Sequence, residues 1–535
     1  MKQRRLWTAL AVFTLPLIAG AFILQARGLP DGARLFSQVL QRVQDASVDS
    51  LGYETIYEKA ARGLVKNLDD PYAELYSPKE LNSFQRNSLG NNYGGVGLTI
   101  ESQDGQITVA NVFPNTPGEM GGVIVGDRII KVDTALVTGR PTEFVSSVMT
   151  GVPGTKVDVI FQRSGVPEPI QITFTRAVIE VPAVPFTLVL DGNVGYIPLQ
   201  RFNEVAAQHV EEAIRKLRRQ GASAYILDLR GNPGGSLDEA LKISNLFLQP
   251  GQELARVQHR GRSPEIYNAN QSSIVGEARL IVMVDGGSAS ASEIIAGTLQ
   301  DHDRGLVVGT TTFGKGLVQT LFPLDGGWAL KLTTGKWYTP SGRSIQREHR
   351  GMNDGRFVEG VAMDDNSAPD TTRLGRPTFL SDAGRTVYGG GGVTPDLMVA
   401  PDTLSSAEQE FFRVTASKSQ QTYAIRYQLA IDLKTAVSSN PQYQFQAAWR
   451  EMYWDRLKRG GVEVDRTLFD AAGTWLDRLL DDRISRVAFG EDAAFLRQLP
   501  GDNQLQKALE LLKQGRTQKE LLALAEQLTS KSGDN

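Results

Sequence analysis

The fold is decided by the stretch RLIVMVDGGSASASEIIAGTLQD, residues 279 to 301. An apolar run from Leu280 to Val284 leads into a Gly-Gly turn, and a helix-like pattern begins near Ser290. A buried strand, a tight turn and a helix form the repeating unit of layered α/β domains. Strand-like and helix-like segments alternate in this way from Asn193 to about Thr339, so we predict an α/β domain there.

The segments on either side of this domain have other patterns. Residues 28–90 have a helical pattern that ends in the turn-rich LDDPYAELYSP. Short β-like runs separated by glycine occupy residues 93–177 and predict a compact, partly β module. Residues 346–386 are polar and glycine-rich, as is typical of a surface excursion. Helical periodicity follows from Ser405, which is spaced from Glu408 as in a capping box.

Composition excludes several classes of function. The net charge of -3 gives no overall basic field, which argues against nucleic acid as a partner. The absence of cysteine excludes a disulfide framework, a thiol nucleophile and a lipid-modified N-terminal cysteine. A chain of 535 residues is long enough for about three or four domains.

The N-terminus predicts export. A basic segment at residues 2–5 precedes an uncharged run at 6–24, the pattern of a signal peptide or a membrane anchor. Small residues at 19–21 offer a cleavage site, so both interpretations of residues 1–27 stay open, and a buried helix of a cytosolic protein is the weaker third. Because the positive flank stays in the cytoplasm, we expect a periplasmic protein or one anchored to the inner membrane and facing the periplasm.

Three serines, Ser288, Ser290 and Ser292, lie where the strand passes into the helix. Free backbone N–H groups at a helix N-terminus can stabilise an oxyanion, so a hydroxyl placed there can act as a nucleophile. Serine is also a favoured N-cap residue, and this stretch alone favours the structural role. A nucleophilic serine further requires an activating base.

The best candidate for that base is Lys315 in TTFGKGLVQT, 25 residues after Ser290. A buried lysine can accept a proton when it is neutral. Gln319 could orient the lysine if the backbone at Gly316 forms a turn, whereas on a strand the two side chains would lie about 13 Å apart. The four histidines lie in helical or polar segments and form no triad-like motif: His209, His302, His259 and His349.

Two glycine-rich segments allow further interpretations. Residues 309–315 fit most of a phosphate-binding loop, but Gly316 replaces the Ser or Thr that binds magnesium, and a β-like run follows where a helix is required. A nucleotide-dependent enzyme is therefore a weak alternative. Residues 228–235, DLRGNPGG, follow a strand, and their N–H groups could form one side of an oxyanion hole.

The segments DLRGNPGGSLDEA, GGSASASEIIAGTLQD and FGKGLVQ, in this order and spacing, closely resemble the carboxyl-terminal processing proteases, also called tail-specific proteases. The resemblance extends from about Leu68 to Val399 and includes KWYTPSGRSIQ and GGGVTPDL. It implies structural roles for Ser288 and Ser292. The catalytic residues it implies are Ser290 as nucleophile, Lys315 as base and Gln319 as the group that completes the site. The oxyanion hole it implies consists of the backbone amides of Ala291 and of Gly234 or Gly235.

The resemblance also implies that residues 91–178 form a PDZ domain. Its carboxylate-binding loop is YGGVGL, residues 93–98, and its exposed amides would receive a chain terminus by strand addition. The segment NTPGEMGGVIVGDRIIKVD fits the same domain, although Gly118 and Gly121 stand where alanines are more usual. The implied peptide-binding residues are Gly95, Val96, Gly97 and Leu98.

The implied architecture is α/β and α+β multidomain, with a PDZ domain inserted ahead of a crotonase/Clp-protease-like α/β catalytic core. The expected parts are a signal peptide or anchor at 1–27, a helical arm at 28–90, the PDZ domain at 91–178, the serine protease core at 179–400 and a helical region at 401–535.

The implied activity is that of an exported serine endopeptidase that needs neither a metal nor a nucleotide. Its PDZ domain would recognise unstructured C-terminal ends of proteins, and cleavage would proceed through an acyl-enzyme on Ser290. The main alternative is a catalytically silent PDZ scaffold that binds peptides without hydrolysing them. An adaptor protein, membrane anchoring by residues 6–24 and a homo-oligomer stay open as partners and assemblies, and residues 401–535 lie outside the resemblance.

Overall fold

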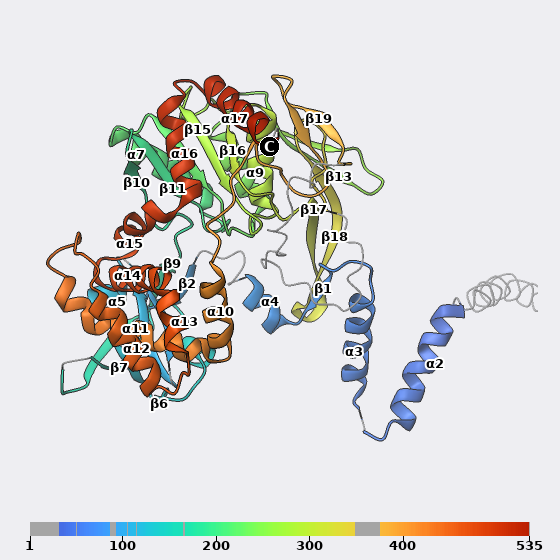
Figure 1. Cartoon of the computed structure of the whole chain (residues 1–535). Coiled ribbons are helices and arrows are strands. Elements are labelled where there is room, and N and C mark those ends of the chain that lie inside the picture. The colour runs from blue at the N-terminus through green and yellow to red at the C-terminus, as the bar shows by residue number, and fades with distance from the viewer. Residues whose placement is uncertain are drawn as a thin grey trace, which may run out of the picture. The chain divides into compact units, whose positions relative to one another are not determined.

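The computed structural model describes residues 31–49, 51–85, 92–103, 105–113, 115–163, 166–347 and 375–533 (Figure 1). The chain divides into two units, residues 1–78 with 320–333, and residues 79–319 with 334–535. The predicted signal or anchor at 1–27 and residues 348–374 of the predicted excursion lie outside the described residues. Within the described ranges, none of the helices has the length and apolar character that crossing a membrane requires.

The first unit combines the N-terminal arm with a strand hairpin from much later in the chain. The hairpin is formed by β17 (Leu317–Pro323) and β18 (Ala329–Tyr338), and residues 320–333 belong to this unit. The carboxylate of Asp70 accepts hydrogen bonds from the N–H and the hydroxyl of Thr333, both at 2.9 Å. The other elements are α2 (Asp31–Ala46), α3 (Tyr53–Lys66) and β1 (Glu74–Tyr76), which pairs antiparallel with β18; α4 (Pro78–Phe84) begins where the unit ends.

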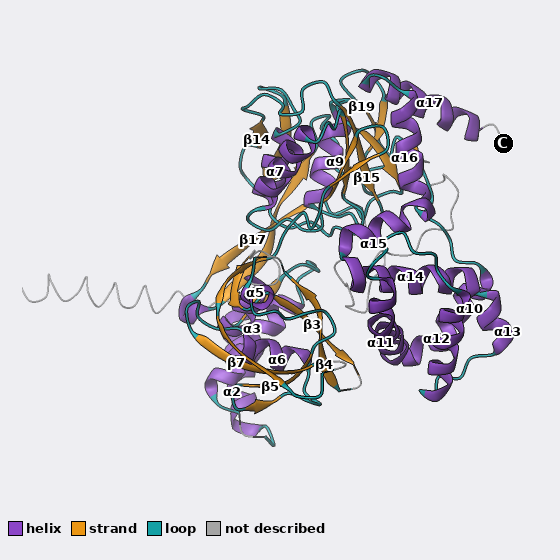
Figure 2. Cartoon of the chain, turned by 90° about the vertical axis from the view of Figure 1, so that its left-hand side faces the viewer, coloured by secondary structure: helices purple, strands orange, loops and turns teal. Residues whose placement is uncertain are grey.

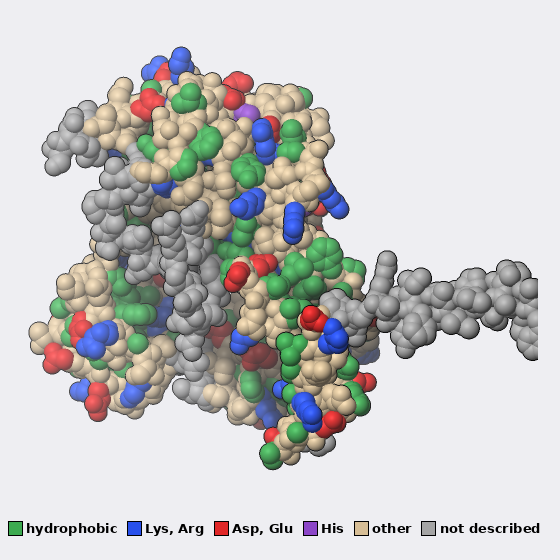
Figure 3. All heavy atoms as spheres, turned by 90° about the vertical axis from the view of Figure 1, so that its right-hand side faces the viewer, with side chains coloured by type: hydrophobic (Ala, Val, Ile, Leu, Met, Phe, Trp, Pro, Cys, Tyr) green, Lys and Arg blue, Asp and Glu red, His purple; other side chains and the backbone are tan. Residues whose placement is uncertain are grey.

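Helix α2 buries none of its residues. Its apolar side chains, with several of α3, are exposed, and Figure 3 shows hydrophobic groups at the surface on this side. The exposed apolar residues of the two helices are Leu35, Phe36, Val39, Val43, Tyr53, Tyr57 and Leu64. The strong amphipathic pattern of α2 is therefore not used for burial inside the described part of this unit, whereas α3 buries Ile56 and Val65.

The module predicted to be a PDZ domain contains a twisted sheet in the order β3-β4-β5-β7-β8, with β3 at one edge. Its helix α6 packs against β3 and β5, and the core between them is apolar. The strands are β2 (Asn92–Gly95), β3 (Leu98–Gln103), β4 (Gln106–Val112), β5 (Arg128–Val132), β6 (Ala135–Leu136), β7 (Lys156–Gln162), β8 (Ile170–Thr175) and β9 (Ala177–Glu180). The helices are α5 (Pro117–Met120) and α6 (Thr142–Met149).

The predicted catalytic core is built on a six-stranded sheet in the order β10-β11-β12-β15-β16-β21. Strand β10 is antiparallel to β11, and all other neighbours are parallel. The strands are β10 (Leu188–Leu190), β11 (Val194–Pro198), β12 (Ala224–Asp228), β15 (Arg279–Val284), β16 (Leu306–Gly309) and β21 (Leu397–Met398).

Alternate residues of these strands pack into two hydrophobic clusters on opposite faces. Leu280 and Val282 of β15 face α7 (Ala206–Arg219), α8 (Leu237–Asn245) and α9 (Ala291–Asp301). Ile281 and Met283 face α16 (Asn503–Gln514) and α17 (Gln518–Gly533), so β15 lies between α9 and α16 (Figure 2). Burial on both faces explains why the parallel strands appear in the sequence as continuous apolar runs.

Further β structure borders the core. Strands β13 (Glu253–His259) and β14 (Glu265–Asn268) form a sheet with the distal part of β18, where Val257 lies opposite Trp337. At the end of the predicted polar excursion, 346–386, β19 (Thr378–Leu380) forms a hairpin with β20 (Thr386–Tyr388), which extends just beyond it.

The predicted C-terminal helical region is helical, but it contributes to two separate hydrophobic clusters. Helices α16 and α17 pack on the core sheet, as described above. Phe495 of α15 (Glu491–Gln498) packs against the same cluster. The helices that form a cluster of their own are α10 (Ser406–Thr415), α11 (Ser419–Val437), α12 (Ala447–Arg459), α13 (Arg466–Ala471) and α14 (Gly473–Phe489).

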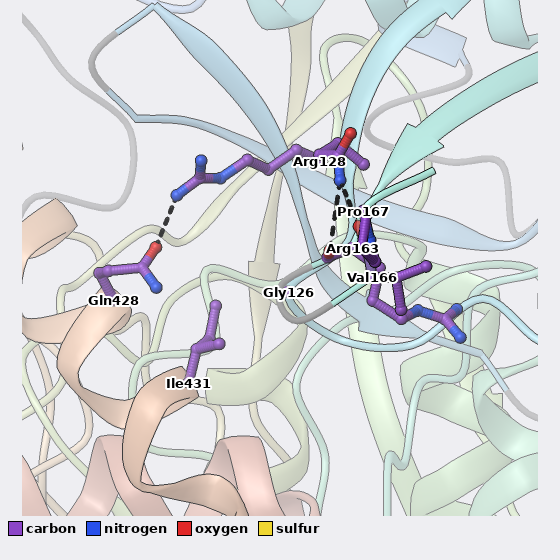
Figure 4. A pocket seen from close by; sticks show the side chains of 8 residues that line it. Gly126, Arg128, Arg163, Val166, Pro167, Gln428 and Ile431 are labelled. Carbon is purple, nitrogen blue, oxygen red and sulfur yellow. Dashed lines mark hydrogen bonds between the residues drawn. The ribbon is translucent and has the colours of Figure 1, made fainter. Parts of the chain in front are cut away.

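Helix α11 lies against strands of the PDZ-like module. The Tyr427 hydroxyl donates to the carbonyl oxygen of Val109 at 2.7 Å, and the Arg128 guanidinium donates to Oε1 of Gln428 at 2.9 Å. Arg128 reaches toward Gln428 beside a cleft of ≈ 370 Å³ (Figure 4). These contacts join the module to the helical cluster within the second unit.

Candidate active site

Three loops that carry the predicted catalytic residues follow three adjacent parallel strands. The glycine-rich loop follows β12, the serine turn follows β15, and the Lys315 segment follows β16. Because the carboxyl ends of parallel strands share one edge of a sheet, these loops converge there. The segment after residue 309 continues into strand β17, so it lacks the helix that a phosphate-binding loop requires.

Ser290 occupies the sharp turn between β15 and α9. Its φ of 54° and ψ of -111° are unusual for a residue other than glycine, and such backbone strain clusters at functional sites. Ser288 and Ser292 are fully buried, and their hydroxyls donate to the carbonyl oxygens of Leu229 and Asn232 at 2.8 and 2.9 Å. These two bonds fasten the serine turn to the glycine-rich loop, while Ser290 is partly exposed.

The glycine-rich loop packs directly on Ser290. A Cβ atom at Gly234 would lie 3.0 Å from Cβ of Ser290 and 2.9 Å from the nitrogen of Ala291, and Gly234 has a φ of +95°. The Gly234 N–H donates to Oδ1 of Asn232 at 3.0 Å. By contrast, the N–H groups of Gly235 and Ala291 have no hydrogen-bond partner among the described residues. Of the two glycines left open by the sequence, Gly235 is thus the better placed to donate to an oxyanion.

The carboxylate of Glu293 joins the serine turn to the lysine segment. Its Oε2 accepts the N–H of Ser290 at 2.8 Å and the N–H of Lys315 at 2.9 Å. Its Oε1 accepts the N–H of Gly314 at 2.7 Å and the hydroxyl of Thr312 at 2.5 Å. Glu293 is fully buried, and burial raises its pKa more than these four hydrogen bonds lower it. One side chain therefore fixes the backbones of both predicted catalytic residues.

Lys315 is 5% exposed and lies in an irregular segment between β16 and β17. The indole N–H of Trp337 donates to its carbonyl oxygen at 3.1 Å, and the next N–H, of Gly316, donates to Oε1 of Gln346 at 2.8 Å. Gln319 lies on β17 and is half-buried. The sequence left open whether the backbone around Gly316 forms a turn or a strand. In the structure, Gln319 lies on a strand.

A chain of polar groups lies under the glycine-rich loop. The Tyr196 hydroxyl donates to Oδ2 of Asp228 at 2.7 Å, and Asp228 forms an ion pair with Arg230 at 2.7 Å. Arg230 also pairs with Asp502, at the start of α16, at 2.7 Å. Burial alone would lower the pKa of Arg230, but Asp228 and Asp502 together raise it above the ordinary value. Burial and the charge of Asp228 raise the pKa of Tyr196.

His209 and His302 contact groups outside the segments that carry Ser290 and Lys315. His209 Nδ1 accepts the N–H of Ala183 at 3.1 Å, and His302 contacts Oδ2 of Asp382 and the carbonyl oxygen of Glu253, both at 2.7 Å. Within the described ranges, no group of three or more acidic or histidine side chains is arranged to hold a metal ion.

The predicted peptide-binding loop joins β2 to β3, the edge strand of its sheet. The N–H groups of Val96 and Gly97 have no hydrogen-bond partner among the described residues. Gly97 has a φ of +82°, and a Cβ atom there would lie 2.3 Å from Cβ of Thr116. The loop conformation therefore depends on glycine at this position.

Comparison with known proteins agrees with this geometry. Residues 193–354 match Peptidase family S41, and residues 94–174 match the PDZ domain. The carboxy-terminal-processing protease of Bartonella bacilliformis is 35% identical over 315 residues, which cover 58% of this chain and 72% of that protein. The chain belongs to the carboxy-terminal processing protease family.

Another relative of this processing protease is CtpA of Bacillus subtilis, which is 35% identical over 295 residues that cover 55% of this chain and 62% of CtpA. The alignment thus spans somewhat less than two thirds of CtpA. Among solved structures, the photosystem II D1 C-terminal processing protease is 28% identical and covers 59% of this chain and 91% of its own, with a TM-score of 0.34.

The sequence-based predictions of the family, of the fold class and of a serine-type peptidase are confirmed. A PDZ domain precedes the S41 core in this processing protease. The roles of individual residues stay predictions. Sequence reasoning missed Glu293 and Arg230, although the spacing of Ser290 and Glu293 is itself a capping-box signal.

Proposed function

We propose that this protease cleaves peptide bonds with Ser290 as nucleophile and Lys315 as general base. The single observation that supports this pair best is the carboxylate of Glu293, which accepts the backbone N–H of both residues. Two residues 25 positions apart in the chain are thereby held at one edge of the sheet. No described histidine is placed to take the role of the base.

In the first step, neutral Lys315 takes the proton of the Ser290 hydroxyl as Oγ attacks the peptide carbonyl carbon. The negative charge that develops on the carbonyl oxygen is stabilised by the N–H groups of Ala291 and Gly235, at the positive end of the α9 dipole. The C–N bond then breaks, the amine leaves with the proton from Lys315, and the acyl group stays on Oγ. Water then gives a proton to Lys315 and attacks the ester carbonyl carbon. The C–Oγ bond breaks, Lys315 returns the proton to Oγ of Ser290, and the acyl group leaves as a carboxylic acid.

The PDZ domain selects the substrate by its C-terminal end. Strand β3 lies at the edge of the sheet, so an extended peptide can pair with it. The N–H groups of Val96 and Gly97 precede this strand and are suited to the terminal carboxylate. Recognition of this kind requires an extended, unpaired chain, so we propose unstructured C-terminal ends as substrates.

We further propose that the protease is exported, in a periplasmic or membrane-anchored form. The support is the basic segment at residues 2–5 and the uncharged run that follows it.

The test is digestion of an unfolded reporter protein with an apolar C-terminal tail. We expect the wild type to cleave it and the folded variants Ser290→Ala and Lys315→Ala to lose at least a thousandfold in kcat, because nucleophile and base act as a unit. Equal cleavage by all three proteins would contradict the assignment. Binding of the tail without hydrolysis by the wild type would favour the PDZ scaffold.

A second comparison tests substrate selection. Gly97→Ala distorts the loop through its contact with Thr116, whereas Gly122→Ala, also at a positive φ of +76°, meets nothing within 4 Å. Only Gly97→Ala should weaken cleavage of the tailed reporter relative to a reporter whose C-terminus is amidated. Equal preference in both variants would contradict recognition by this loop.

A further inference from the structure

Helix α16 is linked to the glycine-rich loop through Arg230. The Arg230 guanidinium donates to Oδ1 and Oδ2 of Asp502 at 2.9 and 2.7 Å, and to Oε1 of Gln504 at 3.1 Å. On its other side it donates to Oδ2 of Asp228 at 2.7 Å. Asp228 ends strand β12, and Asp502 lies 272 residues after Arg230 in the chain. A planar guanidinium between two carboxylates forms a geometrically defined bridge.

Asp502 is held in place because it caps helix α16, which packs on the core sheet. Its Oδ1 accepts the N–H of Leu505 at 3.0 Å, so Asp502 is also the N-cap of the helix. Leu505 and Leu509 are buried against the core sheet. Gln504 is 3% exposed, and its amide donates to the carbonyl oxygen of Val399 at 2.7 Å. Arg230 is thus held between a buried strand and a buried helix.

The loop that begins at Arg230 needs such support. Gly231, Gly234 and Gly235 all have positive φ angles, and glycine loses more conformational freedom on ordering than any other residue. A Cβ atom at Gly231 would meet nothing within 4 Å, and the backbone there is held by a polar contact, the Gly231 N–H donating to Oδ1 of Asp285 at 2.8 Å. Polar contacts therefore order this loop along its length, and the Arg230 bridge is the one at its start.

We propose that Asp502 is a positioning residue of the active site. Its carboxylate holds Arg230, and through Arg230 it holds the glycine-rich loop where the Gly235 N–H faces the oxyanion. Helix α16 is thus part of the catalytic machinery although it lies outside the segments that carry the catalytic residues. This inference rests on the proposed oxyanion role of the loop.

The test is the variant Asp502→Asn. Asparagine is as good an N-cap as aspartate, so α16 keeps its cap. It lacks the charge, and its NH₂ group replaces the oxygen that accepts from one guanidinium N–H, so the ion pair and that hydrogen bond are lost while Oδ1 can still accept from the other N–H. The matched control is Asp465→Asn, because Asp465 caps α13 through the N–H groups of Thr467 and Leu468 and is exposed.

We expect Asp502→Asn to lower kcat on the reporter by about tenfold with KM unchanged, since displacement of the loop affects the transition state and leaves substrate binding intact. Hydrogen exchange of residues 230–236 should become at least tenfold faster. Asp465→Asn should change neither quantity. Wild-type kcat together with wild-type exchange in Asp502→Asn would overturn the proposal.

Hydrogen exchange separates this proposal from the proposed function. If the wild type does not cleave the reporter, the peptidase mechanism fails, whereas the exchange of residues 230–236 still decides whether Asp502 orders the loop. Should Asp502→Asn unfold, Arg230→Lys replaces it, because a lysine cannot contact both carboxylates in the same plane. Wild-type exchange in folded Arg230→Lys would also overturn the proposal.

Discussion

The segments that carry Ser290 and Lys315 both donate backbone N–H groups to Glu293. At the scale of single residues, the candidate active site depends on side chains that bind backbone as much as on the side chains proposed to react. Ser288 and Ser292 have the same function on the other side of the turn, where their hydroxyls bind the glycine-rich loop. Such contacts fix the geometry before a substrate arrives.

Replacement of Glu293 by glutamine tests this role. One of its two oxygens becomes an NH₂ group that faces at least one backbone N–H donor, so at least one of the four hydrogen bonds is lost. We expect kcat to fall by about a hundredfold, because a misplacement of about 1 Å is sufficient for such a loss. The free energy of unfolding should fall by roughly 1–3 kcal/mol.

The control is Glu408→Gln in the exposed capping box of α10, where the glutamate accepts the N–H of Ser405 at 2.7 Å. It makes the same chemical change at the same helix position and should leave kcat as it is. Equal activity in both variants, measured with denaturation curves on the same samples, would refute the role of Glu293.

A pair of glycine variants separates backbone strain from contact with the nucleophile. Gly231→Ala and Gly234→Ala both place alanine at a positive φ, of 66° and 95°. The first should cost roughly 1–2 kcal/mol of unfolding free energy and retain activity. The second should also abolish cleavage, because its Cβ atom meets Ser290 and Ala291. Activity assays and thermal unfolding of both variants check this, and an active Gly234→Ala variant would contradict it.

At the scale of elements, helix α11 and the PDZ strands form a continuous polar contact. Glu101 on β3 lies opposite Thr108 on β4, which lies opposite Arg128 on β5. The Tyr423 hydroxyl donates to Glu101 at 2.7 Å, and Gln428 accepts from Arg128. Helix α11 thus runs along the row formed by Glu101, Thr108 and Arg128. This row lies on the face of the sheet opposite to the apolar core of the PDZ module.

The titration of Tyr423 tests this contact. Burial and the hydrogen bond to Glu101 raise its pKa from 10.0 to about 12. Below pH 10 the hydroxyl keeps its proton in folded and unfolded chains, so its stabilising contribution is complete there. As the pH rises from 10 to about 12, the unfolded chain loses the proton first and that contribution disappears.

The difference in unfolding free energy between wild type and Tyr423→Phe should therefore shrink by roughly 1 kcal/mol over this range, after allowance for solvent screening at a partly exposed group. Urea denaturation at several pH values measures it. A constant difference for Tyr423→Phe would show that the contact does not persist in solution.

At the scale of the whole molecule, the sequence predicts secondary-structure elements that show a local pattern. It does not predict contacts between segments that are far apart in the chain. The alternation of strands and helices, the strand at Leu280 to Val284 and the turn at Ser290 follow from patterns within a few residues. Periodicity also predicts the C-terminal helices. It cannot say that α16 covers the core sheet while α11 contacts the PDZ strands, because an apolar helix face does not specify its partner.

The same limit applies to the site. Ser290 and Lys315 were accessible from linked motifs, whereas the partnership of Arg230 with Asp502 joins residues 272 positions apart. Neither residue carries a spacing that points to the other. Such a pair becomes visible only when the chain is folded.

Two truncations separate the parts of the molecule. Removal of residues 503–535 exposes Ile281, Met283 and other apolar residues of the sheet, so we expect loss of cooperative unfolding and aggregation. Removal of residues 1–49 takes away α2, which buries no residue, and the core should keep its Tm. Thermal unfolding of both forms measures the contrast, and a soluble, cooperatively folded first truncation would contradict the role of α16 and α17.

The packing of helix α17 also bears on self-digestion. The proposed substrates are loose polypeptide ends, so an extended end of a neighbouring copy would itself be a substrate. Leu521 and Ala525 are buried against the core, and the Thr529 hydroxyl donates to the carbonyl oxygen of Asp396 at 3.2 Å. A helix anchored in this way offers no extended strand for pairing with another molecule, so we expect the stretch from 518 to 529 to resist cleavage by the enzyme itself.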